Sequence, residues 1–422
     1  MAGLVALTFF PVLEERPLSL MDALFTSVSA VTLTGLSTVS VSLFSRQGQW
    51  IMLVLMQTGG IGILYFASRL LIIPGRSASR SQHMMVRERW SEVNELAPKK
   101  LTQNIILGVL SLEILGTTIL YFLFSGNGVD SPFFVSLFHS VSALVNGGFT
   151  TFTAGNLELL TTAPIAAALG ILILLGRLGY VVFAEVFQKT THKSHQWSLN
   201  VPVSLIGTAV IIILGTGLYM FVGRNSNTGF WTALMRTINV RTAGFSIIDP
   251  AQSFPVARIL SMLLMFVGGA AGSVTGGIKI TAAVILVLTA VKGYGTEKRI
   301  ILFRRRISVT AQSRTVLFFL RAVGLAVTSI LLLALTETVF NSTAGFAFGD
   351  LVFESVSAFT TSGLSTGITT SLSNAGKLIL IATMITGRIG LLLLVAQMGR
   401  GPRSKPEKVT HTIYPEGEVL LG

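Results

Sequence analysis

One phrase recurs along the chain and constrains its fold more than any other feature. Each copy joins a short, weakly polar run to a glycine that is followed by an apolar residue. Three close copies occupy residues 25–36, 138–149 and 353–364, and a divergent copy occupies 234–245. In the close copies, the second serine (Ser29, Ser142 or Ser357) lies six residues before the glycine. The glycines are roughly 100 to 120 residues apart, which is too far for a solenoid repeat and typical of a duplicated membrane module.

The segments between the copies are too apolar for a soluble protein. Hydrophobic residues make up 51% of the chain and charged residues 12%, and the mean hydropathy is +0.73. Several apolar runs, such as 105–124 and 203–222, reach the length of about 20 residues that spans a membrane. The absence of cysteine excludes disulfides and thiolate metal sites. We therefore expect an all-α polytopic membrane protein.

A net charge of +13 would suggest nucleic-acid binding in a soluble chain. The positions of the charges along the chain have to decide whether this explanation applies. Lys and Arg gather between the apolar runs, in blocks at residues 69–100, 189–193, 292–314 and 400–408. Residues 125–131 and 341–349, on the other side, carry neither. This asymmetry follows the positive-inside rule and places the basic blocks in the cytoplasm. We expect a multi-pass protein of the cell membrane that contacts the lipid bilayer and no nucleic acid.

Each phrase lies between two apolar runs, so the chain divides into repeated units. The predicted pore units are residues 1–75, 76–190, 191–298 and 299–400, followed by a cytoplasmic C-terminal tail at 401–422. The first run, residues 2–13, is short for a spanning helix, which predicts a short or truncated first helix. The expected architecture is four pseudo-symmetric units of helix, re-entrant pore loop and helix around one pore.

The phrase itself supplies about a dozen residues of helix, which is too short to cross a membrane. We expect a re-entrant helix that returns as extended chain, because protein or water can satisfy such a backbone inside the bilayer. Asp22 and Asp350 precede two of the phrases and are predicted to cap these helices. The serines of the phrase are expected to act as small packing residues.

The glycines of the phrases can adopt φ > 0 without steric cost, as a sharply turned, extended segment requires. These filter glycines are Gly35, Gly148, Gly244 and Gly363. Carbonyl groups before each glycine can then converge on a dehydrated cation. The predicted coordinating residues are Leu33 and Thr34, Asn146 and Gly147, Thr242 and Ala243, and Thr361 and Ser362. Glycines at tight helix contacts are the alternative, but four matched copies favour a pore lining.

The chain resembles the Trk/Ktr/HKT superfamily of potassium transporters. Thr34-Gly35-Leu36, Ser362-Gly363-Leu364 and the run 241–245 carry the resemblance at the filter. The run 268–279 resembles the gating loop of the third unit, and Gly387-Arg388-Ile389-Gly390 resembles the arginine motif of the fourth. The chain length and the ending at 414–422 are most similar to the Ktr membrane (B) subunit.

The resemblance implies a potassium-translocating subunit of a cation uptake system. The implied gate consists of Gly268, Gly269, Gly272, Ser273, Thr275, Gly276 and Gly277, with Arg388 facing the pore as an electrostatic barrier. The transported ion would be K+, with no cofactor, and Na+ remains open as a coupling ion in a symport. The implied partners are a second copy in a homodimer and a cytoplasmic nucleotide-binding regulatory ring of Ktr A-type subunits.

Two other functions are weighed against this one. A sodium-selective or non-selective cation transporter is the first; in the superfamily, serine at the first filter glycine accompanies sodium passage, and Gly35 therefore favours potassium. A membrane-embedded enzyme is the second, but the five histidines are scattered and no catalytic constellation emerges.

Alternatives also remain for individual residues. The run 268–277 could be a flexible packing kink, and it is no nucleotide-binding loop because Ile278 stands where the lysine would be. Arg177 is expected either to line the pore or to pair with Glu113 or Glu185. Arg241 is expected to have a structural role at a helix C-terminus. Lys279 is left between a carboxylate partner and the cytoplasmic interface.

Overall fold

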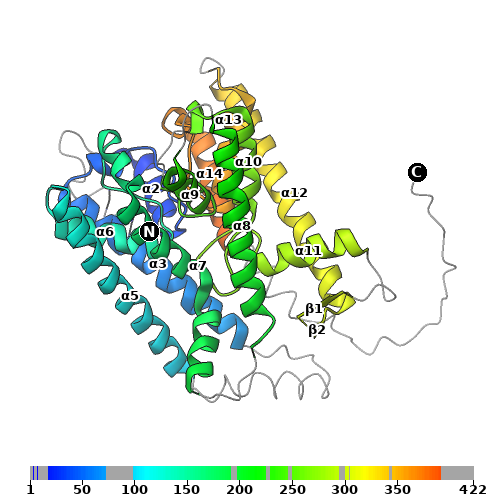
Figure 1. Cartoon of the computed structure of the whole chain (residues 1–422). Helices are drawn as coiled ribbons and strands as arrows, with labels where there is room; N and C mark the ends of the chain where they lie inside the picture. Colours follow the sequence, from blue (N-terminus) through cyan, green and yellow to red (C-terminus); the bar gives the residue numbers. More distant parts are fainter. Residues whose placement is uncertain are drawn as a thin grey trace.

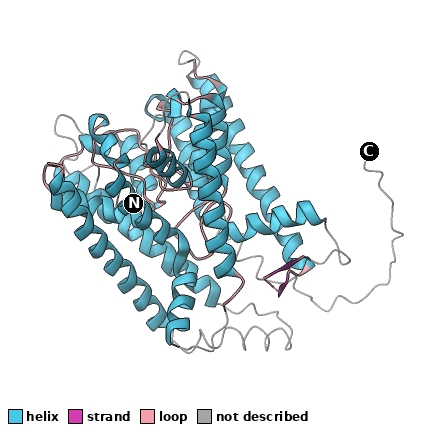
Figure 2. Cartoon of the chain, in the orientation of Figure 1, coloured by secondary structure: helices cyan, strands magenta, loops and turns pink. Residues whose placement is uncertain are grey.

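The computed structural model describes residues 3, 7, 18–72, 98–191, 197–224, 229–245, 250–293, 300–303, 305–341 and 345–390. These residues are mostly helical (Figure 2). Within these residues, three helices are long and apolar enough to cross a membrane: α5 (Pro98–Gly126), α8 (Asn200–Val222) and α12 (Val309–Phe340). They open the second, third and fourth predicted units. Most of the short opening helix predicted at 2–13 lies outside the described residues, as does the tail at 401–422.

Four short helices coincide with the recurring phrases. They are α2 (Leu20–Val31), α6 (Pro132–Leu144), α9 (Phe230–Val240) and α13 (Phe348–Thr360), with 11 to 13 residues each. At 1.5 Å per residue, such a helix is about 20 Å long at most, whereas the hydrocarbon core is about 30 Å thick. These helices therefore cannot cross the membrane and have the length of re-entrant helices.

The helix that follows each short helix returns through the molecule. These helices are α3 (Arg46–Ile72), α7 (Ala163–Thr191), α10 (Pro255–Phe266) with α11 (Ile280–Lys292), and α14 (Asn374–Ile385), which continues as a π-helical turn, Thr386–Gly390. The third is interrupted between Phe266 and Ile280, where the glycine-rich run predicted a break. Beyond it, α11 runs at a steep angle to α10 (Figure 1). A small antiparallel pair, β1 (Ile301–Leu302) and β2 (Arg305–Arg306), follows and was not predicted.

Contacts between units join them in chain order. The returning helix of each unit contacts the short helix of the next: α3 contacts α6, α7 contacts α9, α10 contacts α13, and α14 contacts α2. The last of these contacts brings the fourth unit back to the first, so the contacts between units form a closed circle. Of the predicted unit boundaries, 75/76, 298/299 and 400/401 lie outside the described residues, and 190/191 falls in the last turn of α7.

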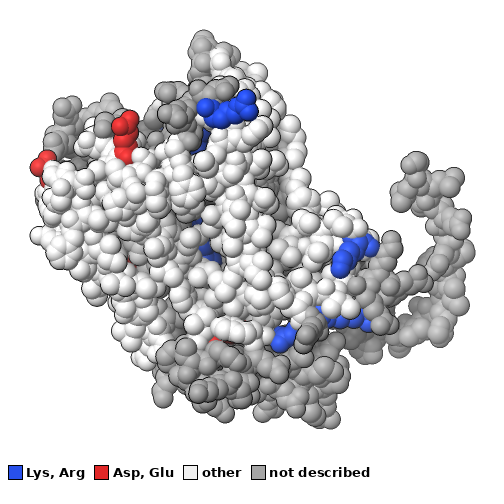
Figure 3. Space-filling model, viewed as in Figure 1, with Lys and Arg blue, Asp and Glu red and all other residues white. Residues whose placement is uncertain are grey.

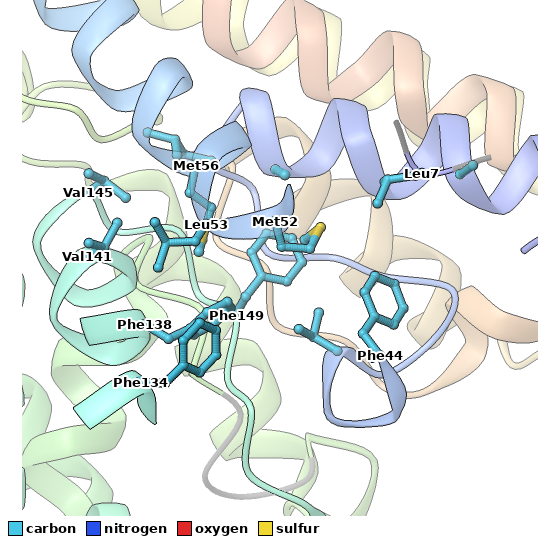
Figure 4. Close-up of a cluster of buried hydrophobic side chains, with 14 of the residues drawn as sticks. Leu7, Phe44, Met52, Leu53, Met56, Phe134, Phe138, Val141, Val145 and Phe149 are labelled. Atoms are coloured by element: carbon cyan, nitrogen blue, oxygen red, sulfur yellow. The ribbon is translucent and has the colours of Figure 1, made fainter. Parts of the chain in front are cut away.

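Apolar side chains fill the contact between α3 and α6. Met52 and Met56 of α3 face Phe138 and Val141 of α6, and Phe149 of the following segment packs among them (Figure 4). All of these side chains are buried. The flexible thioethers of methionine fill the irregular space between the flat rings and the helix. This cluster fixes the second short helix against the first unit.

Two ion pairs join neighbouring units near the beginnings of the short helices. Lys377 of α14 binds Asp22 of α2 at 3.0 Å, and Arg258 of α10 binds Asp350 of α13. The prediction that these aspartates cap their helices is wrong. Ser19 caps α2 by accepting a bond from the Asp22 amide at 3.1 Å, and Ala347, the N-cap residue of α13, provides no side-chain cap. The carboxylates therefore connect units rather than end helices.

The described charges are unevenly placed over the surface. On the face in Figure 3, acidic side chains lie at the upper left, while basic side chains form one group at the top and another at the lower right. Arg305 and Arg306 of β2 precede α12, whose other end leads to the acidic start of α13. The basic end of α12 is the predicted cytoplasmic end. Most of the predicted basic blocks lie outside the described residues.

Glycines allow three returning helices to cross the ends of the short helices. A Cβ on Gly59, Gly176 or Gly387 would collide with a backbone carbonyl, that of Val31, Leu144 or Phe359 respectively. Each of these carbonyls belongs to the last turn of a short helix. The backbone of the returning helix thus lies directly against the point where the short helix ends. No residue larger than glycine fits there without displacing one of the two helices.

Substituting these glycines should destabilise the protein, and α3 offers a matched pair. We expect Gly59→Ala to cost about 1–3 kcal/mol and to lower the melting temperature of the purified protein, because its methyl group overlaps the Val31 carbonyl. Gly62→Ala meets nothing within 4 Å in the same helix and should be neutral or stabilising, because alanine favours helix. Thermal unfolding, monitored by size-exclusion chromatography, measures the melting temperatures of both variants. Equal melting temperatures for the two variants would contradict the close crossing.

Candidate functional site

The four recurring glycines share one backbone conformation. Their φ angles are 94° at Gly35, 74° at Gly148, 75° at Gly244 and 83° at Gly363, so the predicted positive φ is confirmed. A second residue, two positions earlier, also has positive φ in each copy: Leu33 (54°), Asn146 (55°), Thr242 (80°) and Thr361 (51°). The left-handed region is uncommon for residues other than glycine, and especially so for threonine. This second position was not predicted, although asparagine, found there in one copy, tolerates the left-handed conformation.

The four segments meet closely in space. A Cβ on each glycine would meet the carbonyl oxygen of the residue before the next glycine in chain order: Gly35 meets Gly147 at 2.9 Å, Gly148 meets Ala243 at 2.8 Å, Gly244 meets Ser362 at 2.8 Å, and Gly363 meets Thr34. The contacts close a ring. Glycine is therefore required at all four positions for two reasons, the positive φ and the close approach of a neighbouring backbone. Four of the eight predicted coordinating carbonyls lie in this ring.

Backbone hydrogen bonds turn the chain at the end of three short helices. The amide before the glycine donates to the carbonyl of the phrase's second serine: Thr34 to Ser29 at 2.9 Å, Gly147 to Ser142 at 2.7 Å, and Ser362 to Ser357 at 2.9 Å. This bond, together with the preceding left-handed residue, is a Schellman motif. The third copy differs, because the Ala243 amide donates to Asn239 at 3.0 Å.

Side chains of the short helices hold the segment that follows the glycine. Glu354 accepts hydrogen bonds from the Thr366 amide at 2.9 Å, from Thr369 Oγ1 at 3.0 Å, and from Ser365. His139, at the same position of the second copy, bonds Thr150 Oγ1 at 2.8 Å. Both side chains are fully buried. The sequence marked this position only as variable, because the first copy has threonine there.

The serines of the phrase do more than pack, so the packing prediction is wrong for two of them. Ser29 Oγ accepts a bond from the Gly35 amide at 3.2 Å, and Ser142 Oγ donates to the Phe149 carbonyl at 2.8 Å. Ser357 Oγ has no partner within the described part of the chain. Two of the four turns are thus tied to their own helix by a side chain.

The interruption between α10 and α11 is a closed, hydrogen-bonded loop. The Gly268 amide donates to the Ile278 carbonyl at 2.9 Å, and the Gly269 amide donates to Thr275 Oγ1 at 2.8 Å. Lys279 Nζ donates to the Thr275 carbonyl at 2.7 Å. Gly272 and Gly277 have φ of 78° and 66°. Lys279 therefore binds the loop itself, which is neither of the two roles left open for it.

The loop lies against the fourth ring segment. A Cβ on Gly276 would lie 2.5 Å from the Thr360 carbonyl oxygen and would also meet Thr361 Oγ1. The middle of the loop meets the kink of α7, where a Cβ on Gly179 would lie 2.6 Å from the Ser273 amide nitrogen. The structure thus brings together the predicted gate residues and places them in contact with the second and fourth units.

Arg388 is buried at the same place, with 3% of its surface exposed. Its Nη1 donates to Thr361 Oγ1 at 3.2 Å, while Nε and Nη2 have no partner among the described residues. Arg388 therefore lies where the interruption loop and the fourth ring segment meet. No carboxylate of the described chain pairs with it.

Arg241 and Arg177 are buried between the ring and the helices around it. Arg241 donates to the carbonyls of Val267 at 3.2 Å and Gly268 at 2.9 Å, so its predicted structural role is confirmed and it fixes the start of the loop. Arg177 donates to Asn146 Oδ1 at 3.1 Å and to the Ile238 carbonyl at 2.5 Å.

The carboxylate partners predicted for Arg177 are wrong. Glu113 accepts instead from Gln57 Nε2 at 2.8 Å, and Glu185 accepts from the Ser198 amide at 2.8 Å. Glu113 thus bonds α3 and Glu185 bonds the segment before α8, and their spacing in the sequence could not show this. Arg177 is held by an amide oxygen and a backbone carbonyl, which are neutral partners.

The sequence matches known transport proteins over nearly its whole length. The model of the TrkH family, described as cation transport protein, matches residues 4–399. The Ktr system potassium uptake protein B of Vibrio alginolyticus is 30% identical over 98% of this chain and 90% of its own length. The protein of the same name from Bacillus subtilis is 30% identical, with 99% and 93% covered. The potassium/sodium uptake protein NtpJ of Enterococcus hirae is also 30% identical, with 100% and 93% covered.

The fold matches as well. The crystal structure of the potassium transporter TrkH from Vibrio parahaemolyticus superimposes with a TM-score of 0.68 at 21% identity, covering 90% of this chain and 78% of the other. The predicted all-α polytopic membrane fold is therefore confirmed. Because the relatives are named as uptake proteins, the chain is a transport protein of the cell membrane and not an enzyme. It belongs to the TrkH family of cation transport proteins.

Proposed function

We propose that the chain is the potassium-translocating subunit of a cation uptake system, with a selectivity filter made of backbone carbonyls. The observation that carries the proposal is the closed ring in which each recurring glycine meets the carbonyl of the next segment. The names of the relatives support potassium as the ion, since two are called Ktr system potassium uptake protein B.

Such a filter replaces the hydration shell of the ion with carbonyl oxygens. The ring contains the carbonyls of Thr34, Gly147, Ala243 and Ser362, one from each unit. The carbonyls of the left-handed residues two positions before each glycine form a second proposed layer of coordinating oxygens. A left-handed residue followed by a glycine of positive φ gives a segment that alternates in direction, as an extended row of inward carbonyls requires.

The interruption loop is the proposed gate. It lies against Thr360 and Thr361, so it closes the path on the side of the filter that faces α11. Arg388 supplies a positive charge there with no compensating carboxylate among the described residues. A cation passing at about 4 Å would meet a repulsion of about 4 kcal/mol at an effective dielectric constant of about 20. Movement of the loop would open the path, and the loop's glycines permit that movement.

The proposed assembly is a homodimer on a cytoplasmic nucleotide-binding regulatory ring. The support is that the relatives are named as parts of a Ktr system, which implies further subunits. The basic block around Arg305 and Arg306 offers a docking surface at the cytoplasmic end. No cofactor is proposed for the chain itself.

Sodium is the second candidate, either as a coupling ion or as a transported ion. The relative from Enterococcus hirae is named a potassium/sodium uptake protein and covers the whole of this chain. Gly35 at the first filter position favours potassium as the selected ion.

Purified protein in liposomes tests the ion. We expect rubidium or potassium influx down a gradient to exceed sodium influx by at least tenfold, which corresponds to about 1.4 kcal/mol. Gly35→Ser should reduce this ratio, because its side chain at φ 94° would displace the Gly147 carbonyl from the ring. Gly108→Ser, at a site in α5 with nothing within 4 Å, is the matched control and should keep the ratio. Sodium influx equal to potassium influx in the unaltered protein would overturn the potassium assignment.

The barrier is tested at Arg388. We expect Arg388→Gln to raise potassium influx at least tenfold, because it removes a repulsion of about 4 kcal/mol and a tenfold increase requires only about 1.4 kcal/mol. Arg388→Lys keeps the charge and should retain the low influx. If both variants reduce influx alike, Arg388 supports the structure and does not oppose the ion.

A further inference from the structure

One guanidinium takes the place of a backbone hydrogen bond in the third ring segment. In the other three segments, the amide before the glycine donates to the carbonyl six residues before the glycine. The corresponding carbonyl in the third segment is that of Ile238, but the Ala243 and Gly244 amides donate instead to the Asn239 carbonyl, at 3.0 Å and 3.2 Å. Arg177 Nη2 donates to the Ile238 carbonyl at 2.5 Å. At the end of α9, the Asn239 carbonyl is therefore held by the chain's own backbone and the Ile238 carbonyl by a side chain from another unit.

The same guanidinium holds the second ring segment. Arg177 Nε donates to Oδ1 of Asn146, at 3.1 Å, and Asn146 is the left-handed residue of that segment. The side-chain nitrogen Nδ2 of Asn146 donates to the carbonyls of Leu144 and Ile173, each at 3.3 Å. Asn146 is thereby fixed on both sides, and one arginine joins the second ring segment to the third.

We propose that Arg177 is a positioning residue that fixes the distance between the second and third filter segments and so determines selectivity for potassium over sodium. This inference rests on the proposed function. The two segments are neighbours in the ring, since a Cβ on Gly148 would meet the Ala243 carbonyl at 2.8 Å. A change in the spacing of the two segments moves the Gly147 and Ala243 carbonyls relative to each other. The ring of carbonyl oxygens then no longer fits potassium better than sodium.

The chemistry of arginine suits this position. A buried, unpaired cation inside a membrane protein is costly, so it persists where its hydrogen bonds are needed. The planar guanidinium presents its Nε and Nη2 donors in fixed directions and can reach two acceptors at once, whereas a lysine ammonium is a single point charge. The Arg177 carbonyl also accepts a bond from the Ala270 amide at 2.9 Å, so the residue contacts the interruption loop too. Arg177 differs from Arg388 in joining two segments through its side chain.

The decisive variant is Arg177→Lys, which retains the charge and removes the bridge. In liposomes of the full-length protein, we expect the ratio of rubidium to sodium influx to fall about tenfold while cation influx persists, a difference of about 1.4 kcal/mol. Asn146→Gly keeps the left-handed backbone and removes one of the two acceptors, so it should shift the ratio in the same direction by less. The double variant should be no worse than Arg177→Lys alone, because both changes remove the same bridge.

Arg236→Lys is the matched control. Arg236 lies on α9, the short helix that carries Ile238, but it donates to Ser253 at 2.7 Å and stacks on Tyr219, away from the ring. The ratio of rubidium to sodium influx should therefore stay unchanged. If Arg177→Lys keeps the wild-type ratio, the inference is overturned while the proposed function stands. If Arg177→Gln raises rubidium and sodium influx equally and Arg177→Lys behaves as wild type, Arg177 is a charge barrier and the inference is again wrong.

Two further outcomes are separated by design. If the unaltered protein shows no selective rubidium influx, the proposed function fails and the inference falls with it. If Arg177→Lys does not yield a monodisperse protein, the Asn146→Gly variant decides alone, because the glycine accepts the backbone conformation of that residue. An unchanged ratio in Asn146→Gly would then overturn the bridge.

Discussion

The close approach of four glycines to four backbone carbonyls is the constraint on which the rest of the structure depends. The ring requires the four short helices to end close to one another. Each following segment must turn there with two residues of positive φ. Gly59, Gly176 and Gly387 allow the returning helices to press against those helix ends. The ion pairs at Asp22 and Asp350 hold the other ends of two short helices. Two of the four short helices, α2 and α13, are therefore held at both ends.

The ring concentrates backbone states that cost free energy, on the order of 1–3 kcal/mol for each left-handed residue other than glycine. The surrounding bonds explain how these states persist. Schellman bonds close three of the turns, and Glu354 and His139 hold the chain after two of the glycines. These bonds satisfy polar groups that have no access to water, where an unmade bond would cost more than in a soluble domain.

The third unit departs from the other three, and its departures are connected. Its returning helix is interrupted, so the carbonyls of Val267 and Gly268 become free to accept bonds from Arg241. At the end of its short helix, the Ile238 carbonyl binds Arg177, while the Asn239 carbonyl accepts bonds from the Ala243 and Gly244 amides. The interruption loop then occupies the space beneath the ring, against Thr360 and Thr361. Asymmetry in one unit thus provides the loop of the proposed gate while the ring keeps its four glycines.

The membrane class, the four short helices, the glycines with positive φ and the interruption could be predicted, because each of these follows from local composition and from repetition. Tertiary structure decided the partners of the buried charges. Arg177 binds Asn146 and Ile238 instead of a glutamate, Lys279 binds its own loop, and the aspartates pair across units. Such partners lie far apart in the chain, and backbone carbonyls carry no mark in the sequence. Only the folded chain shows which of them a buried cation can reach.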